Sequence, residues 1–478
     1  MHWDLLITNV HLVTGLNDPI QLGSLAVKDG RIAAIGEIDN DAQADVIIDG
    51  QGHYLSPGFI DVHTHDDIAA IKHPEMLTKL SQGVTTVIVG NCGISASPAV
   101  LNDAPPDPMD LLGDQEVFVY PQFRDYAKAV DQSIPAVNVA ALIGHTTLRS
   151  QVMDRYDRAA SDDEIEKMKQ LLGDALEQGA IGFSTGLAYR NAQATPSSEV
   201  EALLEVVGQH DACYSTHMRN ERENLFDSID ESLSGAKLHD VPLTISHLKC
   251  ADPENWGKSI KALSKITQAS QHQTCCCDCY PYDACSTTLD LWRVRHEFEI
   301  RITWSKPHPE QANRLLNEIA DDWGLSMEDA AKKLMPAGAI YHNMSDDDVS
   351  RIVAHPMSMI GSDGLPSDPN PHPRLWGTFS RVLAHYCRDR GLMSLDEAVR
   401  KMTYMPSKQF GLKDRGHLRV GAWADLTLFD FENLQSKATY TNPTEPTSGI
   451  ELVVVNGQIT YKEGQVIGRA GQLLKRNQ

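Results

Sequence analysis

The sequence predicts an α/β fold, a (β/α)8 TIM barrel with a small β domain, and three observations support this prediction. Eight strand-like apolar runs alternate with helical patterns along the middle of the chain. Polar residues that can bind a metal follow several of these runs, and TIM barrels carry their active sites at the C-terminal ends of the strands. A doubly wound sheet would need a glycine-rich dinucleotide turn after an early strand, and the sequence lacks one. The eight runs lie near residues 58–63, 84–90, 136–144, 180–185, 212–217, 241–247, 274–281 and 357–362.

The two ends of the chain differ in pattern from the middle. Residues 1–55 and 413–478 consist of short alternating runs separated by Asp-Gly, Asn-Gly and single glycine turns. This pattern is typical of antiparallel β hairpins. We therefore expect one small β-sandwich domain built from both termini, and a metal-dependent catalytic barrel over residues 56–412.

The first barrel strand runs into the sequence GFIDVHTHDD, Gly58 to Asp67, which contains His63 and His65. On a strand, this i, i+2 spacing places both imidazoles on the same face. Each such residue alone is also compatible with a structural role. Six groups at the same end of successive strands, however, match the ligand chemistry of zinc. The other four follow later strand-like runs and are Cys92, His217, His247 and Asp363.

The segments between the strands carry helix signals. Ser161 to Glu164 has the pattern of a capping box, and Ser198 with Glu201 repeats it. The apolar face of the first of these helices contains Ile165, Met168, Leu172 and Ala175.

A cysteine-rich run, TCCCDCYPYD, contains the spacing Cys276-x-x-Cys279. A zinc ribbon or a redox pair would show the same spacing, but no second pair follows. We therefore predict a buried strand. Residues 284–345, between the seventh and eighth strands, are too long for an ordinary loop, and we expect an insertion that forms a lid over the barrel mouth.

Composition narrows the class of protein. The chain has 478 residues, 41% of them hydrophobic, and a formal net charge of −23 from 42 basic and 65 acidic residues. This charge argues against nucleic acid and anionic membranes as partners. The sequence shows neither a secretion signal nor an apolar run of about 20 residues, so we expect a cytoplasmic location. Nine cysteines in a chain of this length do not indicate a disulfide scaffold. The oligomeric state is not predicted.

Together, these motifs resemble the N-acyl-D-amino-acid deacylases, or D-aminoacylases, of the amidohydrolase superfamily. The resemblance covers essentially the whole chain. The cysteine, the PHPRLWGTF segment and YPY are its most specific parts. Its carriers are PGFIDVHTHDD at 57–67, GNCGIS at 90–95, GAIGFSTGLAY at 179–189, THMRNE at 216–221, ISHLK at 245–249, DCYPYDACST at 278–287, GSDGLPSDPNPHPRLWGTF at 361–379 and the terminal GAWADLTLFD.

The resemblance implies zinc-dependent hydrolysis of N-acyl-D-amino acids, a small-molecule substrate class. Many binuclear superfamily members bridge their metals with a carboxylated lysine at the end of strand four, whereas AIGFSTGL has none, and Cys92 resembles the substitute that the deacylases use. We expect a tight Zn²⁺ site at Cys92, His217 and His247, with an open position for water. His63, His65 and Asp363 would form a second, weaker site. If that site is empty, Asp363 is free to act as the general base.

Substrate recognition requires cations for an α-carboxylate. Lys249 and Arg374 are suitable, Tyr280 adds a hydroxyl donor, and by resemblance these positions hold the α-carboxylate. Arg295 is expected in the side-chain pocket, where a cation would favour D-glutamate or D-aspartate. Surface pairing with neighbouring glutamates explains Arg295 equally well, so this alternative stays open. The segment holding it, DLWRVRHEFEIRITW, also contains Arg293 and Arg301.

Other interpretations remain for parts of the chain. His145, also at a strand end, could either contact a metal ligand and orient it, or serve a structural role. A cyclic amide hydrolase resembling hydantoinases or dihydroorotases is a rival function, although the missing strand-four lysine argues against it. A non-catalytic scaffold is a third possibility, but the retention of all six candidate ligands disfavours it.

Overall fold

The computed structural model describes residues 2–39 and 41–477, and it confirms the predicted TIM barrel. Eight parallel strands run in the order β18-β14-β13-β12-β11-β10-β7-β6. Each overlaps one of the eight predicted runs. Their residues are buried throughout, because helices cover the outside of the barrel and side chains fill its inside. The strands are β6 (Phe59–Asp61), β7 (Val84–Val89), β10 (Asn138–Gly144), β11 (Gly182–Gly186), β12 (Cys213–His217), β13 (Leu243–Ile245), β14 (Cys275–Cys279) and β18 (Ser358–Ile360).

The barrel closes between its first and last strands through the segments that follow them. Thr64 and Gly364 form a parallel bridge. The backbone N–H of His65 donates to the carbonyl of Gly364 at 3.0 Å, and that of Asp363 donates to the carbonyl of His63 at 2.6 Å. Three candidate ligands therefore lie on the seam that closes the barrel.

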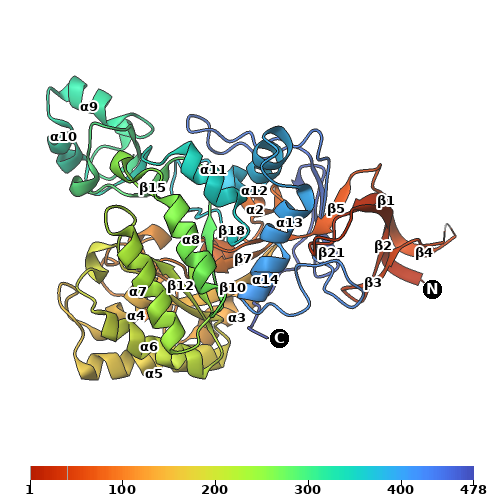
Figure 1. Ribbon diagram of the computed structural model, residues 1–478, viewed down its shortest axis with the longest axis horizontal. Helices are drawn as coiled ribbons and strands as arrows, with labels where there is room; N and C mark the ends of the chain where they lie inside the picture. Colours follow the sequence, from red (N-terminus) through yellow and green to blue (C-terminus); the bar gives the residue numbers. More distant parts are fainter. Residues whose placement is uncertain (1, 40, 478) are drawn as a thin grey trace.

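Helices pack around the strands (Figure 1). The capping box predicted at Ser161 is present at the start of α5 (Asp162–Gln178). The one predicted at Ser198 is wrong, because α6 (Ser197–Gln209) begins one residue earlier and Ser198 lies inside its first turn. The remaining helices are α1 (Ala69–Lys72), α2 (Leu77–Leu80), α3 (Phe123–Ser133), α4 (His145–Val152), α7 (Leu225–Leu238), α8 (Ser259–Ala269), α11 (Asp346–Ala354), α12 (Arg374–Arg381), α13 (Leu395–Met402) and α14 (Tyr404–Gln409).

Both termini contribute to one hydrogen-bonded sheet of nine strands, which encloses its own apolar core. The antiparallel pair β5–β19 joins the N-terminal and C-terminal parts, seen in red and blue in Figure 1. The termini thus build the β domain, while its boundaries at residues 55 and 413 remain a prediction. The strands are β1 (His2–Leu12), β2 (Gln21–Lys28), β3 (Arg31–Gly36), β4 (Gln43–Asp49), β5 (Tyr54–Pro57), β19 (Leu426–Phe429), β20 (Ile450–Val455), β21 (Gln458–Lys462) and β22 (Gln465–Val466).

The segment between β14 and β18 is an insertion with its own small sheet. Its helices α9 (Leu316–Trp323) and α10 (Met327–Leu334) project at the upper left of Figure 1, away from the β domain. The sequence predicted an insertion here but not its sheet. Its three antiparallel strands, in the order β15-β17-β16, are β15 (Cys285–Thr288), β16 (Ile300–Ser305) and β17 (Ala337–Tyr341). A further short pair joins β8 (Ala99–Val100) to β9 (Val119–Tyr120).

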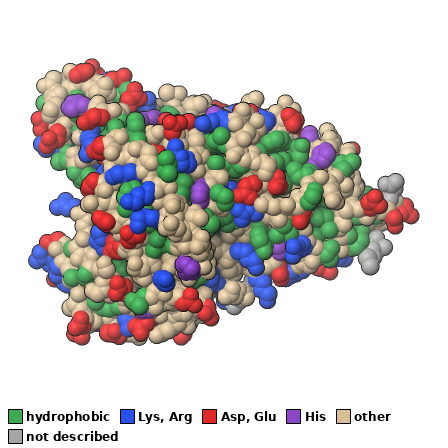
Figure 2. Space-filling model, in the orientation of Figure 1, with side chains coloured by type: hydrophobic (Ala, Val, Ile, Leu, Met, Phe, Trp, Pro, Cys, Tyr) green, Lys and Arg blue, Asp and Glu red, His purple; other side chains and the backbone are tan. Residues whose placement is uncertain are grey.

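Acidic and basic side chains are interspersed on the face shown in Figure 2. Among the described residues, no helix has both the length and the apolar character needed to cross a bilayer. All nine cysteines are buried free thiols, and the run Cys276 to Cys279 lies within β14, as predicted.

Candidate metal centre

The structure brings the six predicted ligands together in two overlapping groups. The ligand atoms of His63, His65, Cys92 and Asp363 lie within 4.8 Å of one another, and so do those of Cys92, His217 and His247. All six side chains are buried. Cys92 belongs to both groups, so its sulfur occupies the position at which one ligand can serve two metals.

Three of these residues have a left-handed backbone, which side chains other than glycine rarely adopt. The φ angles are 54° at Cys92, 35° at His247 and 48° at Asp363. Each follows a barrel strand directly, and the sharp turn directs its side chain into the barrel mouth. Such strain concentrates at functional sites, where the surrounding structure must hold it in place.

Glycines make room for the turn that carries Cys92. Gly90 and Gly93 have φ angles of 76° and 75°. A Cβ on Gly90 would lie 2.1 Å from the carbonyl oxygen of Leu142, and one on Gly93 would lie 2.6 Å from the nitrogen of Gly186. Glycine is therefore required at both positions of the GNCG motif for two reasons, because the backbone there has a positive φ and no side chain would fit.

The Cys92 thiol lies among imidazoles. Its Sγ is 3.2 Å from His63 Nε2 and 3.4 Å from His247 Nε2. Burial raises the pKa of this thiol, but the positive charges of His63 and His247 outweigh burial and hold the pKa well below its ordinary value. The surroundings thus favour the thiolate, which is the form that binds metals.

Imidazole nitrogens without partners support a metal at this position. Among the described residues, neither ring nitrogen of His217 has a hydrogen-bond partner, and Nδ1 of His65 also lacks one. Buried polar atoms normally have partners, so these nitrogens call for an additional group. A divalent ion such as zinc fits the set of thiolate, imidazole and carboxylate donors.

Two acidic residues support the ligands, and the sequence analysis missed both. Asp278, on β14, accepts a hydrogen bond from the backbone N–H of His247 at 2.8 Å, and its Oδ2 lies 3.4 Å from Nδ1 of His63. Glu221 Oε1 lies 3.0 Å from Nδ1 of His247 and 2.7 Å from the ammonium of Lys249. Carboxylates commonly orient metal-binding histidines in this way. The THMRNE and DCYPYD motifs contained both residues, but nothing in their spacing indicated this role.

Asp363 forms an ion pair with Arg374. The two side chains are 2.9 Å apart, between Oδ2 and Nη1. The other oxygen, Oδ1, lies 3.3 Å from His65 Nε2 and 3.5 Å from His63 Nε2. Burial opposes ionisation, but Arg374 and then His63 hold the pKa of Asp363 well below its ordinary value. Asp363 is therefore a carboxylate in this arrangement.

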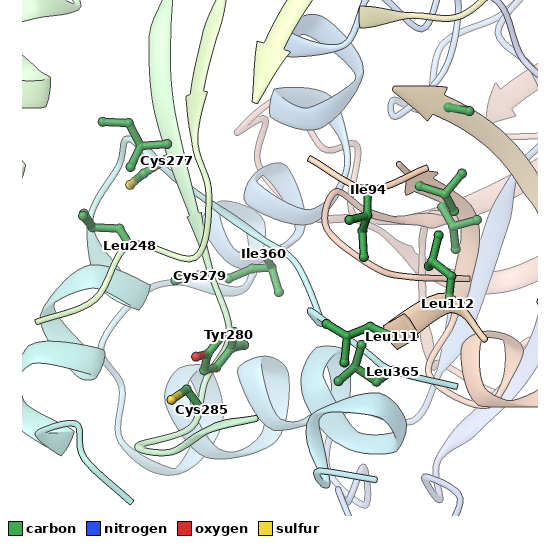
Figure 3. Packing of buried hydrophobic residues seen from close by; sticks show 14 of the residues in the cluster. Ile94, Leu111, Leu112, Leu248, Cys277, Cys279, Tyr280, Cys285, Ile360 and Leu365 are labelled. Carbon is green, nitrogen blue, oxygen red and sulfur yellow. The ribbon is translucent and has the colours of Figure 1, made fainter. Parts of the chain in front are cut away.

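The three residues predicted to hold an α-carboxylate lie beside one another. The guanidinium of Arg374 lies 4.6 Å from the centroid of the Tyr280 ring, and the ammonium of Lys249 lies 5.9 Å from the same centroid. Figure 3 shows Tyr280 next to Cys285, with Leu111, Leu112 and Leu365 grouped apart from them. Lys249 and Arg374 are both buried, although the chain as a whole is acidic.

Arg295 lies apart from this group. It is 35% exposed and forms a surface ion pair with Glu254 at 2.6 Å, which is not one of the neighbouring glutamates that the surface alternative named. Arg293, two residues earlier, is only 7% exposed and lies against Tyr341 of β17. Its nearest carboxylate is Asp290 at 3.8 Å, and its Nε has no hydrogen-bond partner among the described residues. Arg293 is therefore the better placed of the two to meet a buried anion.

His145 belongs to neither ligand group. It begins α4, and its Nε2 lies 3.0 Å from Glu199 Oε1 of α6. Its ring packs edge-on against Phe183 with a centroid distance of 6.0 Å. Of the two interpretations left open, these contacts favour the structural one.

Comparisons with known proteins agree with this geometry. The sequence pattern of the Amidohydrolase family matches residues 46–214 and 319–461. An N-acyl-D-aspartate deacylase from Alcaligenes xylosoxydans xylosoxydans is 44% identical over 474 residues, which are 98% of this chain and 95% of that protein. A D-aminoacylase from the same organism is also 44% identical, over 99% of this chain and 98% of its own.

A solved structure gives the same result. The N-acyl-D-glutamate deacylase from Bordetella bronchiseptica, in complex with zinc and a phosphonate that mimics the tetrahedral intermediate of its reaction, has a TM-score of 0.95 and 42% identity. The match covers 99% of this chain and 100% of that one. These nearly full-length similarities, together with the family pattern, show that the chain belongs to the amidohydrolase family, among its N-acyl-D-amino-acid deacylases.

Proposed function

We propose that this protein hydrolyses the amide bond of N-acyl-D-amino acids in a zinc-dependent reaction, releasing a carboxylate and a free D-amino acid. The observation that carries the proposal is the position of two buried cations, Lys249 and Arg374, beside a six-residue metal-ligand group. The metal site suits amide hydrolysis, and the cations suit a substrate with a free α-carboxylate. The activities of the relatives support the same reaction.

In this proposal Cys92, His217 and His247 hold one zinc ion tightly. His63, His65 and Asp363, with the shared thiolate, form a second and weaker site. A D-aminoacylase of known structure, 44% identical to this chain, has a binuclear centre in which one metal activates and the second attenuates. Zinc, when bound, lowers the pKa of water and polarises the amide carbonyl.

Asp363 moves the proton. The attacking water gives its proton to the Asp363 carboxylate as its oxygen bonds to the acyl carbon. The C–N bond then breaks, and Asp363 returns the proton to the departing amine. The ion pair with Arg374 keeps this carboxylate ionised and fixes its direction.

The chain's cations orient the substrate. Lys249 and Arg374 flank the Tyr280 ring and bind the α-carboxylate, while Glu221 holds the Lys249 ammonium in place. For the side chain we propose Arg293 in the role that the sequence suggested for Arg295. A buried guanidinium whose carboxylate partner, Asp290, lies as far as 3.8 Å away would favour a substrate that brings a second anion, such as an N-acyl-D-glutamate or N-acyl-D-aspartate.

We further propose a cytoplasmic location, because a thiol among the metal ligands and other buried free thiols suit a reducing compartment.

The test is a deacetylation panel of N-acetyl-D- and N-acetyl-L-amino acids on protein of measured metal content, with a hydantoin as the rival substrate. The expected result is turnover of D-substrates alone, highest for acidic side chains. Turnover of the hydantoin without deacetylation would favour the cyclic amide hydrolase. The absence of any turnover by zinc-loaded protein would favour the scaffold.

A further inference from the structure

A fully buried lysine lies on the seam where the barrel closes. Lys79 belongs to α2, and its side chain is 0% exposed. Its ammonium lies 2.8 Å from Asp61 Oδ2, 2.9 Å from Asp66 Oδ2, 2.9 Å from Thr64 Oγ1 and 3.1 Å from Ser362 Oγ. One cation thus contacts four oxygen atoms on two segments separated by about 300 residues of chain.

These partners alternate with the candidate metal ligands along the sequence. Asp61, Thr64 and Asp66 surround the two ligands of DVHTHD, and Ser362 directly precedes Asp363. None of the four partners is itself a candidate ligand. Lys79 therefore contacts the framework of the ligand-bearing segments and leaves the ligand atoms free.

Further hydrogen bonds make this framework rigid. Asp61 accepts from the backbone N–H of Ser362 at 2.8 Å and from its hydroxyl at 2.6 Å. The backbone N–H of Gly364 donates to the same hydroxyl at 3.1 Å. Asp363, with its left-handed backbone, thus lies between two residues held by this network.

The network reaches only one half of the metal centre. Within the described chain, the hydrogen-bond and ion-pair partners of the Lys79 ammonium all follow or end β6 and β18. Cys92 and His247 follow β7 and β13, and His217 is the last residue of β12. Removal of the ammonium would leave two buried carboxylates close together without their cation, and their repulsion would act on the β6 and β18 ends.

We propose that Lys79 is a positioning residue. Its ammonium ties the end of β6 to the end of β18 and so sets the mutual placement of His63, His65 and Asp363. It thereby controls the affinity of the second metal site and the rate of turnover, and it does not control retention of the tight zinc. The turnover part rests on the proposed function, whereas the metal part does not.

The experiment compares Lys79→Met and Lys79→Arg with the wild-type holoenzyme. Zinc per chain is measured after gel filtration, the second zinc is titrated against a competing chelator, and kcat and KM are determined separately. Lys79→Met should keep one tight zinc while its second-site affinity falls by about 10–100-fold. Its kcat with only the tight site loaded should fall by a similar factor, because Asp363 is displaced, and KM should change little. Lys79→Arg should recover part of both losses, because it restores the positive charge.

Lys401 provides a matched control. It is another fully buried lysine, and its ammonium donates to the backbone carbonyls of Val353 and His355. Lys401→Met should affect stability while leaving the second-site affinity and kcat unchanged. If Lys79→Met does not fold, Ser362→Ala removes one hydroxyl from the network and should give smaller changes in the same direction.

The outcomes separate the alternatives. A folded Lys79→Met protein with unchanged second-site affinity and kcat would overturn the proposal. So would loss of the tight zinc to the same extent, or the same metal changes in Lys401→Met, since either would indicate a general structural role. If the wild type has no deacylase activity, the proposed function fails, yet the zinc titration still decides the role of Lys79.

Discussion

The strand-end group, comprising His63, His65, Cys92, His217, His247 and Asp363, and the insertion at residues 284–345 contribute to the same site in different ways. The strand-end group lies at the C-terminal ends of buried barrel strands: His217 ends β12, and the other five ligands lie within four residues after their strands. The insertion adds a small sheet of its own, and the carbonyl of Ser286 on β15 accepts a hydrogen bond from Arg374 at 3.2 Å. The barrel thus holds the reactive groups rigidly, and the insertion supplies surroundings that can vary between relatives.

Charge pairing differs between the two regions as well. Asp363 in the strand-end group has a close cationic partner, Arg374, at 2.9 Å. At the insertion, Arg293 is 3.8 Å from Asp290, and Asp290 lies near the acidic Asp107. A charge with only weak pairing binds a charged ligand more readily, and its protonation state responds more to pH. We therefore expect changes in the strand-end group to abolish the reaction, and changes at the insertion to modify selectivity or stability.

The largest effect is expected from Cys92→Ala. Loss of the thiolate removes a ligand and its compensating charge from the tight site, so both zinc and turnover should be lost. Elemental analysis and a deacetylation assay measure this. Cys213→Ala, which changes another buried thiol on β12, should keep the zinc. A Cys92→Ala protein with stoichiometric zinc and a normal rate would show that the strand-end group is assigned wrongly.

Asp363→Ala should separate chemistry from tight metal binding. The variant is expected to fold and to keep the tight zinc, while kcat falls by about 10²–10⁴-fold or more because proton transfer is lost. Zinc content and kcat are measured on the same preparation. An active variant would transfer the base role to another residue, and loss of the tight zinc would make Asp363 chiefly a ligand.

Arg293→Leu should change selectivity at the insertion. The ratio of kcat/KM for N-acetyl-D-glutamate to that for N-acetyl-D-leucine should fall by about 10–100-fold, since a buried charge pair is lost. Arg295→Leu is the matched control, and because this arginine is partly exposed its effect should be small. A large effect of Arg295→Leu alone would restore the original prediction for that residue.

The smallest effect is expected from Asp107→Asn, on stability. Burial, followed by the charges of Asp290 and Asp110, raises the pKa of Asp107 from 3.8 to about 7. The folded state therefore binds this proton more tightly than the unfolded state, and the resulting stability is present at low pH and is lost as pH rises from about 4 to about 7.

Asp107→Asn should remove this pH-dependent loss of stability. The variant should be more stable than wild type by up to about 4 kcal/mol at pH 8 and about equally stable at pH 4, since the pKa is raised by about three units and one unit corresponds to about 1.4 kcal/mol. Thermal unfolding at both pH values measures the difference. Asp103→Asn, at an exposed position of the same loop, should show no such pH dependence. Equal pH profiles for wild type and Asp107→Asn would contradict the assignment.

Several supporting residues carried no usable signal in the sequence. Glu221 and Lys79 lie in segments where such a side chain is ordinarily solvated, and Asp278 lies in a strand predicted to be apolar. All three become functional only through partners distant in the chain. The choice between Arg293 and Arg295 was similarly undetermined. Arg293 ends a short helical turn, and Arg295 lies in the irregular segment that follows it. Neither segment has a periodicity that indicates which side chain faces inward.

The barrel, the β domain formed by the two termini and the set of candidate ligands could all be predicted from the sequence. These properties depend on local patterns, because alternating apolar runs specify strands, and a TIM barrel places the residues after its strands at a common end. The closure of the seam, the sharing of Cys92 between two ligand groups, and the burial of Lys79 and Arg293 became apparent only in the folded chain. These features depend on contacts between segments far apart in the chain. In the interior, where polarity is low, the free energy of a buried charge depends strongly on which groups surround it.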